Sequence, residues 1–405
     1  MDLKIFAKTI EDECREQVMN LARQEAFKDA KIRIMPDCHA GKGCTIGFTA
    51  NLGDKVVPNL VGVDIGCGMY VVYFGQCVLS DVQLAEIDNF IHENIPSGEN
   101  VNDAAHSVGF AKLQDLKMCG YLKNIERLKC SVGSLGGGNH FIELDKDEDN
   151  GLYLVIHTGS RNLGQQVCKY YQNIAIDECN NKSNELKDKI AELVTRMRLN
   201  GQQKEIKSAI EDLKKEYKCV DKVSAELCYL TGESRDAYLH DMKICQEYAV
   251  NNREEIARRI CEFLYNKFGL TIKRSFHTVH NYIDFEDNII RKGAIRCNEG
   301  EKVIIPLNMR DGSIIGIGKG NEDWNCSGPH GAGRLMSRKE AKQSISMKDF
   351  ADSMGGIYTT SVNEETLDES PMAYKSAQEI IDAVKDTVDI VTVIKPIYNF
   401  KHSES

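Results

Sequence analysis

Long apolar segments are absent from this 405-residue chain, and so is a recognisable secretion signal. No run of 18 apolar residues occurs, so neither a transmembrane helix nor a membrane partner is expected. Residues 1–11 alternate polar and apolar side chains and lack the apolar core and small-residue cleavage site of a signal peptide. A cytoplasmic location is therefore expected, in which the fifteen scattered cysteines are reduced thiols that mostly pack in the core.

A net positive charge is also absent. The 51 Lys and Arg residues are outnumbered by 61 Asp and Glu, which gives a formal net charge of −10. A protein that coats nucleic acid without selectivity is basic overall, so the charge argues against that class. Net charge does not describe a focused cleft, however, and a local basic surface on an acidic body is compatible with this composition.

The common nucleotide-binding motifs are missing as well. The Gly-Lys pair at 318–319 is not part of a P-loop, because Ser313 stands where that motif requires glycine. No G-x-G-x-x-G segment occurs, which argues against a Rossmann site. The K-x-D-G motif of the common nucleotidyltransferases is absent too, since Met309 stands at the lysine position of the segment that comes nearest to it.

Glycine is present in clusters. The glycines gather mainly at the ends of apolar, β-rich runs, in residues 34–43, 60–68, 130–138, 152–164 and 304–320. Such clusters are typical of strands that end in turns where the backbone closely approaches another group. Helical periodicity is found at 84–94, 237–268 and 376–384. The mixture predicts a compact α+β body with mixed sheets and with its functional loops on one face.

The segment 181–220 differs from the rest of the chain because it is charged and amphipathic. Apolar residues recur at helical spacing on both sides of Asn200-Gly201, a dipeptide that stops helices and forms turns. The pattern predicts an antiparallel helical hairpin inserted into the body. Residues 182–218 hold ten Lys or Arg and seven Asp or Glu, a local net charge of +3. The hairpin is either a solvated structural arm or a contact surface for RNA or a protein partner.

Five residues, in glycine-rich or conformationally special segments, have side chains of the types that can ligate metal ions. Asp64 and Cys67 are three positions apart in one such loop, and a thiolate can bridge two ions. His140, His157 and His280 lie in further loops or at strand ends. One carboxylate, one thiolate and three imidazoles suit one or two borderline transition metals, with zinc the first choice on softness alone. The alternative for the first pair is a turn aspartate beside a buried cysteine.

His330 lies in a further glycine-rich segment, 327–334. Its flanking glycines allow the backbone to approach a phosphate closely, and Arg334 is spaced to bind phosphate oxygens. A histidine in this setting can be a metal ligand, a general acid or a nucleophile toward phosphorus, and the motif alone does not decide. The residues by themselves therefore support a mononuclear or dinuclear metal enzyme with anion-binding loops.

These motifs occur in the order seen in one known family. They are MPDCHAGKG (35–43), DIGC (64–67), GGGNHFIE (136–143), HTGSR (157–161), HNY (280–282), NMRDG (308–312), GKGN (318–321) with WN (324–325), HGAGRLMSR (330–338), AYK (373–375) and KPIYNFK (395–401). The chain resembles the RtcB-type tRNA-splicing and RNA-repair ligases from about residue 30 to residue 401. The resemblance implies a single α+β domain, residues 1–405, of the kind peculiar to that family.

The resemblance also implies a reaction. RNA with a 2′,3′-cyclic phosphate or 3′-phosphate end would be joined to a 5′-hydroxyl end, with GTP as the second substrate. Water would open the cyclic phosphate, His330 would become guanylylated, GMP would pass to the RNA 3′-phosphate, and the 5′-hydroxyl would displace it. Two Mn²⁺ ions replace the zinc expected from softness. Cys67 would bridge them, with Asp64 and His140 on one ion and His157 and His280 on the other. An activating protein is a further candidate partner.

The resemblance further assigns a GTP site. Asn139 and Asn281 would lie near the phosphates, and Glu143 is the candidate partner for the second ring nitrogen of His330. No role follows for Asp37 or His39. The alternatives are a metal-dependent phosphoesterase and a paralogue specialised for one damaged RNA; ordinary core packing is the alternative for Phe141 and Tyr374. The full expected GTP-binding set is Asn139, Phe141, Glu143, Asn281, Asn308, Ser313, Arg334, Tyr374 and Lys401.

Overall fold

Two β-sheets form the body of the protein. The computed structural model describes residues 2–105, 112–216 and 223–403. The five-stranded sheet has the order β1-β2-β3-β9-β8, and only its β1–β2 pair is parallel. Its strands are β1 (Asp2–Ile5), β2 (Lys31–His39), β3 (Ile46–Asn51), β8 (Asn281–Asp284) and β9 (Ile289–Lys292).

The seven-stranded sheet is antiparallel and nearly closes into a barrel. Its order is β11-β12-β14-β5-β6-β4-β7, and the backbone N–H of Ile304 on one edge donates to the Thr278 hydroxyl on the other at 3.3 Å. Buried apolar side chains such as Val71, Phe141 and Ile394 fill the inside. The strands are β4 (Gly68–Gln76), β5 (Phe141–Lys146), β6 (Gly151–Thr158), β7 (Arg274–Val279), β11 (Lys302–Asn308), β12 (Gly312–Gly318) and β14 (Val388–Phe400).

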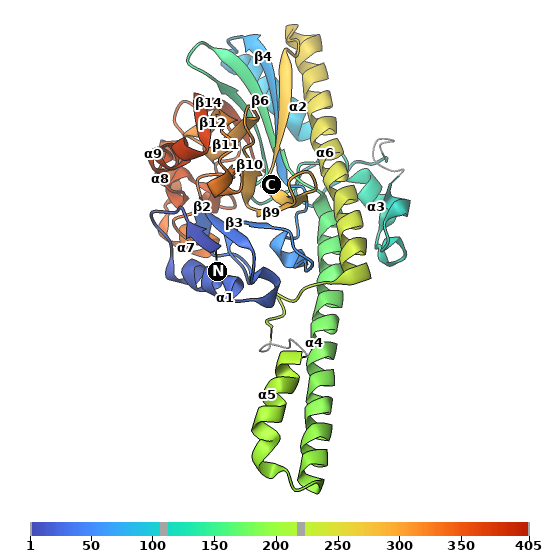
Figure 1. Ribbon diagram of the computed structural model, residues 1–405. Coiled ribbons are helices and arrows are strands. Elements are labelled where there is room, and N and C mark those ends of the chain that lie inside the picture. The colour runs from blue at the N-terminus through green and yellow to red at the C-terminus, as the bar shows by residue number, and fades with distance from the viewer. Residues whose placement is uncertain (1, 106–111, 217–222, 404–405) are drawn as a thin grey trace.

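Two helices cover the outer face of this barrel-like sheet, α2 (Asp81–Asn94) and α6 (Gly232–Phe268) (Figure 1). Ser80 and Gln83 form a capping box that starts α2, and Gly269, in a left-handed conformation, ends α6. The helices expected at 84–94, 237–268 and 376–384 are all present, the last as α9 (Ala377–Ala383).

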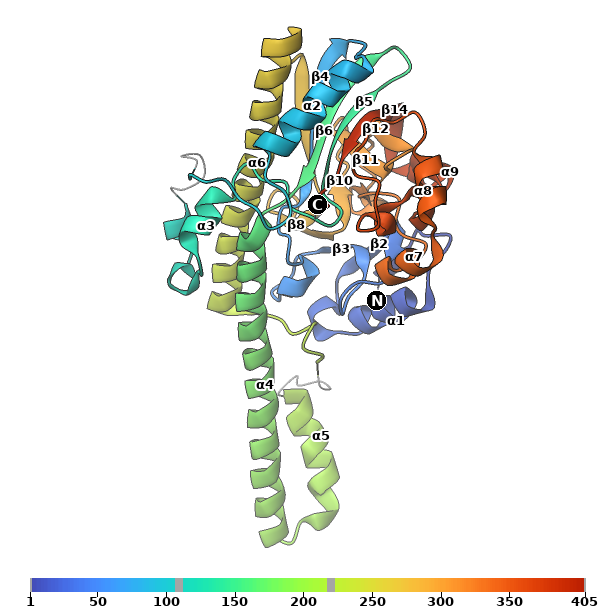
Figure 2. The same cartoon turned by 180° about the vertical axis from the view of Figure 1, so that it is seen from behind.

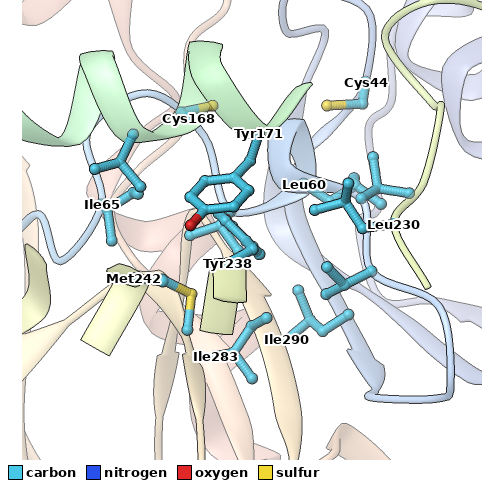
Figure 3. Packing of buried hydrophobic residues seen from close by; sticks show 14 of the residues in the cluster. Cys44, Leu60, Ile65, Cys168, Tyr171, Leu230, Tyr238, Met242, Ile283 and Ile290 are labelled. Carbon is cyan, nitrogen blue, oxygen red and sulfur yellow. The ribbon is translucent and has the colours of Figure 1, made fainter. Parts of the chain in front are cut away.

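A long helix, α4 (Arg161–Leu199), joins the body to a projecting arm. Its first half packs in the core, where Tyr171 meets Tyr238 of α6 (Figure 3). Its second half runs beside α5 (Ile206–Glu216), away from the two sheets, as both views show (Figures 1 and 2). The turn lies at Asn200-Gly201, as expected. The first helix, however, begins at Arg161, far earlier than residue 181.

The arm is therefore an extension of a body helix, and its being an insertion stays a prediction. Leu186 and Met197 are buried, in keeping with the predicted apolar stripe. Residues 217–220 of the predicted hairpin lie outside the described residues. No helix in the described ranges is long and apolar enough to cross a bilayer. The remaining regular elements are α1 (Asp12–Ala22), α3 (Ile125–Cys130), α7 (Arg338–Ser344), α8 (Met347–Ser353) and the strand pair β10 (Ala294–Arg296) and β13 (Ser327–Pro329), with short 3₁₀ turns between them.

Candidate active site

The register of the seven-stranded sheet brings the predicted metal ligands together. Gly68, the residue after Cys67, pairs with Thr158 on one side and with Val279 on the other. Phe141, the residue after His140, pairs with His157. Antiparallel neighbours thus place the start of β4 and β5 beside the end of β6 and β7. Four segments that are far apart in sequence meet at this end of the barrel.

The ligand atoms form a continuous chain of short contacts. Cys67 lies in the middle, with its Sγ 3.3 Å from His157 Nε2 and 3.6 Å from His140 Nε2. On one side, Asp64 Oδ2 lies 3.0 Å from His140 Nε2. On the other side, the Nε2 atoms of His157 and His280 are 3.3 Å apart. The thiol therefore lies between one carboxylate–imidazole pair and one imidazole pair.

Hydrogen bonds to the backbone orient two of these rings. His140 Nδ1 lies 2.9 Å from the Leu135 carbonyl oxygen, and His157 Nδ1 lies 3.1 Å from that of Asn139. A carbonyl only accepts, so each Nδ1 donates its proton, and each ring turns its Nε2 toward Cys67. Burial lowers the pKa of His157 and of His280 well below the usual imidazole range, which keeps both rings neutral.

The donor set fits a transition-metal centre. The ligand atoms of Cys67, His140 and His157 all lie within 4.8 Å of one another, and all three residues are buried. Burial raises the pKa of the Cys67 thiol well above its usual value, so the thiolate needs a metal ion to displace its proton. Burial would raise the pKa of Asp64 as well, but the hydrogen bond and charge of His140 outweigh it and hold the pKa near 2.

His330 lies beside this cluster, with its ring centroid 5.0 Å from that of His280. A buried carboxylate, Asp37 on β2, holds it at three points. Asp37 Oδ2 accepts hydrogen bonds from the backbone N–H groups of His330 and Gly331, each at 3.1 Å. The same oxygen lies 2.7 Å from His330 Nδ1, a short contact that is not aligned as a hydrogen bond. This leaves Nε2 of His330 as the nitrogen directed away from the carboxylate.

The expectation that Glu143 holds the His330 ring was wrong. Glu143 accepts a hydrogen bond from Asn399 Nδ2 at 2.5 Å on the neighbouring strand, and Asp37 occupies the position at Nδ1. Burial raises the pKa of Glu143 to about 7, opposed by the charge of Lys401 and the bond from Asn399. The two carboxylates have different partners because Glu143 lies on β5 of the seven-stranded sheet, whereas Asp37 lies on β2 of the five-stranded sheet.

A single cavity of about 860 Å³ contains these groups. Its walls come from both sheets and from the loop after β13. They include four of the five metal-ligand candidates; His140 lies just behind Cys67 and is not part of the wall. The predicted nucleotide-binding residues and nucleophile that line the cavity are Asn139, Phe141, Glu143, Asn281, Asn308, His330, Arg334, Tyr374 and Lys401.

One end of the cavity has a buried charged cluster. Lys401 Nζ lies 3.0 Å from Glu369 Oε2 and 5.4 Å from the centre of the Phe141 ring. The Tyr374 hydroxyl donates to Glu369 at 2.7 Å, and the Arg334 guanidinium lies 5.1 Å from the Tyr374 ring centre. Burial alone would raise the pKa of Glu369, but the neighbouring cations, Lys401 foremost, lower it to about 2. This end thus offers an ammonium donor, a carboxylate acceptor and aromatic faces.

The side chains of three other residues predicted to bind GTP, Asn308, Asn281 and Ser313, are less available to a ligand. The Asn308 side chain accepts from the N–H groups of residues 310 and 311 and so stabilises its own turn. Asn281 accepts from the Gly293 N–H and lies against the loop of Asp64. Ser313 is fully buried on β12 and is not among the residues that line the cavity. Its contact with GTP stays a prediction without geometric support.

Comparison with known proteins agrees with this geometry. The family model described as "tRNA-splicing ligase RtcB" matches residues 17–402. The chain belongs to the RtcB family of RNA ligases. It is 29% identical over 423 residues to the "RNA-splicing ligase RtcB" of Escherichia coli strain K12, covering 96% of this chain and 94% of that protein. The "tRNA-splicing ligase RtcB" of Nanoarchaeum equitans is 27% identical over 466 residues, covering 93% and 89%.

Two acidic residues at the candidate site, Asp37 and Glu369, had no role expected from the sequence. Asp37 was noticed only as part of a family motif, and its contact with His330 spans 293 positions of sequence. Glu369 lies in a 3₁₀ turn (Leu367–Glu369) that contains no motif, so nothing in the chain pointed to it. His39, also without an expected role, lies with its ring centre 6.4 Å from that of His330, and burial lowers its pKa to about 4.

Proposed function

We propose that this RtcB-family chain is a GTP- and Mn²⁺-dependent ligase. It joins RNA 2′,3′-cyclic-phosphate or 3′-phosphate ends to 5′-hydroxyl ends through a guanylylated His330. The observation that carries the proposal is the position of His330: one ring nitrogen faces the buried Asp37 carboxylate, and the ring stands beside the Cys–His cluster in the same cavity. A histidine that acts as a phosphorus nucleophile attacks through one ring nitrogen, and a carboxylate beside the other nitrogen can stabilise the charge that the ring gains.

In the first step His330 Nε2 forms a bond to the α-phosphorus of GTP. The bond from that phosphorus to the bridging oxygen of the β-phosphate breaks, and pyrophosphate leaves. Asp37 stabilises the positive charge that the ring gains when it becomes a phosphoramidate. An RNA 3′-phosphate oxygen then bonds to the GMP phosphorus while the bond from that phosphorus to His330 Nε2 breaks. Finally the 5′-hydroxyl oxygen loses its proton and attacks the RNA 3′-phosphorus, and the bond from this phosphorus to the GMP oxygen breaks, which releases GMP.

The Cys67, Asp64, His140, His157 and His280 side chains would hold two Mn²⁺ ions, which supply Lewis-acid stabilisation of phosphate charge when bound. Cys67 is the bridging candidate because its sulfur contacts one imidazole of each predicted ion site. Zinc, which suits a thiolate–imidazole set, is expected to compete, since manganese is low in the Irving–Williams order.

The charged end of the cavity is suited to guanine. Guanine presents an acceptor at O6 and a donor at N2. Lys401 would donate to O6, and the Glu369 or Glu143 carboxylate would accept from the base, with Phe141 and Tyr374 available for stacking. Arg334 would contact phosphate. The support for this orientation is that the mutually bonded residues Lys401, Glu369 and Tyr374 line the same cavity as His330.

Incubation with α-labelled GTP and Mn²⁺ tests the proposal. The wild type should retain label as a covalent adduct that is labile in acid and stable in base, as expected of a phosphoramidate. His330→Ala should give no adduct and should not seal 3′-phosphate ends, while its metal content stays at the wild-type level. Sealing of an RNA that already carries 3′-linked GMP should survive in part, because that end no longer needs the nucleophile.

The same experiment separates the ligase from a metal-dependent phosphoesterase. A wild type that forms no adduct but hydrolyses phosphoester ends would favour the phosphoesterase, with His330 as the general acid. Loss of metal together with loss of adduct in His330→Ala would make His330 a ligand instead. The natural RNA, and with it a role in repairing one damaged RNA, is tested by comparing ligation rates on broken tRNA-like and unstructured substrates.

A further inference from the structure

The middle of helix α6 carries two neighbouring polar residues that are completely buried, Asn252 and Arg253. The helix packs directly against the loop of Asp64 and Cys67. A Cβ added at Gly66, whose φ is +74°, would lie 2.9 Å from the Cα of Gln246 on this helix. Buried polar side chains of this size need partners, because an unpaired buried amide or guanidinium is costly. Apart from Thr158 Oγ1 and His277 Nδ1, the partners of both residues are backbone groups of the ligand-bearing loops.

Asn252 binds two of these loops. Its Oδ1 accepts from the N–H groups of Gly133 and Ser134, at 2.8 and 3.1 Å. Its Nδ2 donates to the carbonyl oxygens of Ser134 and Gly159, each at 3.1 Å. Ser134 precedes Leu135, whose carbonyl oxygen is the acceptor that orients His140. The oxygen and the nitrogen of the Asn252 side chain are thus both bonded, and together they join the loop before His140 to the loop after His157.

Arg253 connects the loop before Cys67 to the end of the strand that carries His157. Its Nη1 donates to the Gly66 carbonyl oxygen at 2.7 Å and to the Thr158 carbonyl oxygen at 2.9 Å. Gly66 precedes Cys67, and Thr158 follows His157. Arg253 Nη1 therefore connects the backbone beside Cys67 to the backbone beside His157. The Cys67 sulfur and His157 Nε2 are 3.3 Å apart.

We propose that Asn252 and Arg253 are positioning residues that fix the spacing of Cys67, His140 and His157 before a metal ion binds. The inference rests on the proposed metal site. None of the three ligands makes a direct hydrogen bond to either residue among the described contacts, so the effect acts through the loop backbones. Groups that orient metal ligands typically contribute about 10- to 100-fold in metal affinity. Because α6 is a 37-residue helix that also packs against α4, it provides a rigid support for this spacing.

The test compares conservative variants at these positions with a matched variant elsewhere on α6. Asn252→Asp keeps the size and Oδ1 but places a second acceptor against the Ser134 and Gly159 carbonyls. Arg253→Lys keeps the charge but cannot span two carbonyls with a planar group. The matched control is Asp241→Asn. Asp241 is equally buried and accepts from the N–H groups of residues 117 and 118, in a loop that carries no candidate ligand.

Mn²⁺ affinity is measured by calorimetry at a temperature where every variant is folded, and metal-free stability is measured separately by thermal unfolding. Asn252→Asp and Arg253→Lys should lower Mn²⁺ affinity at least tenfold, whereas Asp241→Asn should leave it within about twofold despite a loss of stability. Wild-type affinity in both site variants, with only stability reduced, would overturn the positioning role. A wild type that binds no divalent metal would instead overturn the metal part of the proposed function, and this inference with it.

A second measurement needs no variant. Hydrogen exchange of the metal-free wild type should already show strong protection of the Gly133 and Ser134 amides, since Asn252 holds them before any ion is present. Rapid exchange of these amides without metal, followed by protection when Mn²⁺ is added, would overturn the inference, because the loop would then be ordered by the ion.

Discussion

At the scale of single residues, Asp37 joins His330, the candidate nucleophile, to β2 of the five-stranded sheet. One of its carboxylate oxygens contacts the His330 ring and two backbone N–H groups of the His330 loop. Asp37→Asn keeps an oxygen for the backbone but removes the charge that faces the ring. We expect guanylylation by GTP to slow about 10²- to 10⁴-fold, as when an orienting carboxylate is neutralised elsewhere. The rate at which labelled GMP becomes attached to the variant, compared with the wild type, measures this loss.

Metal content is the control for this variant and should equal that of the wild type, because Asp37 is not a ligand candidate. Sealing of pre-guanylylated RNA should change little. Wild-type adduct formation in Asp37→Asn would mean that the 2.7 Å contact has no part in activating His330.

Cys67 is the residue on which the number of bound ions depends. Its sulfur lies between the imidazoles of His140 and His157, so Cys67→Ala should lose both ions, whereas His140→Ala and His280→Ala should each lose about one. Elemental analysis of purified protein measures this directly. Cys168→Ala, at another buried cysteine, is the matched control and should retain both ions. Two ions retained in Cys67→Ala would exclude a bridging thiolate.

The raised pKa of Glu143 predicts that the free energy of unfolding depends on pH. Burial raises its folded pKa from 4.5 to about 7, so the native state binds more protons than the unfolded state between these values. The stability that Glu143 contributes is therefore full below pH 4.5 and is lost as the pH rises through 7. Relative to Glu143→Gln, the metal-free wild type should lose on the order of 3 kcal/mol across this window. Denaturant unfolding at several pH values measures the difference, and a constant difference would refute the shift.

At the scale of elements, local patterns were enough to predict some of the helices but not α1, α3, α7 or α8, and not where α4 begins. Periodicity predicted α2, α6 and α9, and Asn200-Gly201 predicted the turn between α4 and α5. The start of α4 at Arg161 was missed because its first half is apolar core and its second half is charged surface. A pattern change of that kind looks like a boundary in sequence, although one continuous helix passes through it.

The arm formed by α4 and α5 predicts a salt-dependent contact with RNA. Residues 182–218 carry a local charge of +3 on a protein of net charge −10. Deleting residues 181–220 should leave guanylylation intact and weaken ligation of long structured RNA at low salt. The weakening should shrink as salt rises, because phosphate contacts release counterions.

A paired substitution within the arm distinguishes charge from shape. Arg196→Gln with Arg198→Gln, both at exposed positions, should reproduce part of the defect. Glu192→Gln, also exposed, should not weaken ligation. Unchanged low-salt ligation by the deletion variant would leave the arm as a structural extension of α4.

At the scale of the whole molecule, the candidate site lies where the two sheets meet. His280 stands between β7 of the seven-stranded sheet and β8 of the five-stranded sheet, and Asp37 reaches His330 from β2. Composition and motifs could nominate Asp64, Cys67, His140 and His157 because each stands in or beside a glycine-rich segment, and His280 because it stands in the HNY motif. They could not predict Asp37 or Glu369 as partners, because those contacts depend on how distant strands pair.

This placement predicts that metal binding stabilises the entire fold. The ligands come from four segments and connect both sheets, so ions that bind only the folded state should raise its unfolding temperature. At a free Mn²⁺ concentration 100 times the dissociation constant, the gain is about 2.7 kcal/mol per site, a rise of about 2–5 °C for a protein of this size. Thermal unfolding of chelator-treated protein across a Mn²⁺ titration measures it. His330→Ala should show the full rise, since His330 is not a ligand, and Cys67→Ala should show almost none. An equal rise in Cys67→Ala would mean that Mn²⁺ stabilises the protein at other sites.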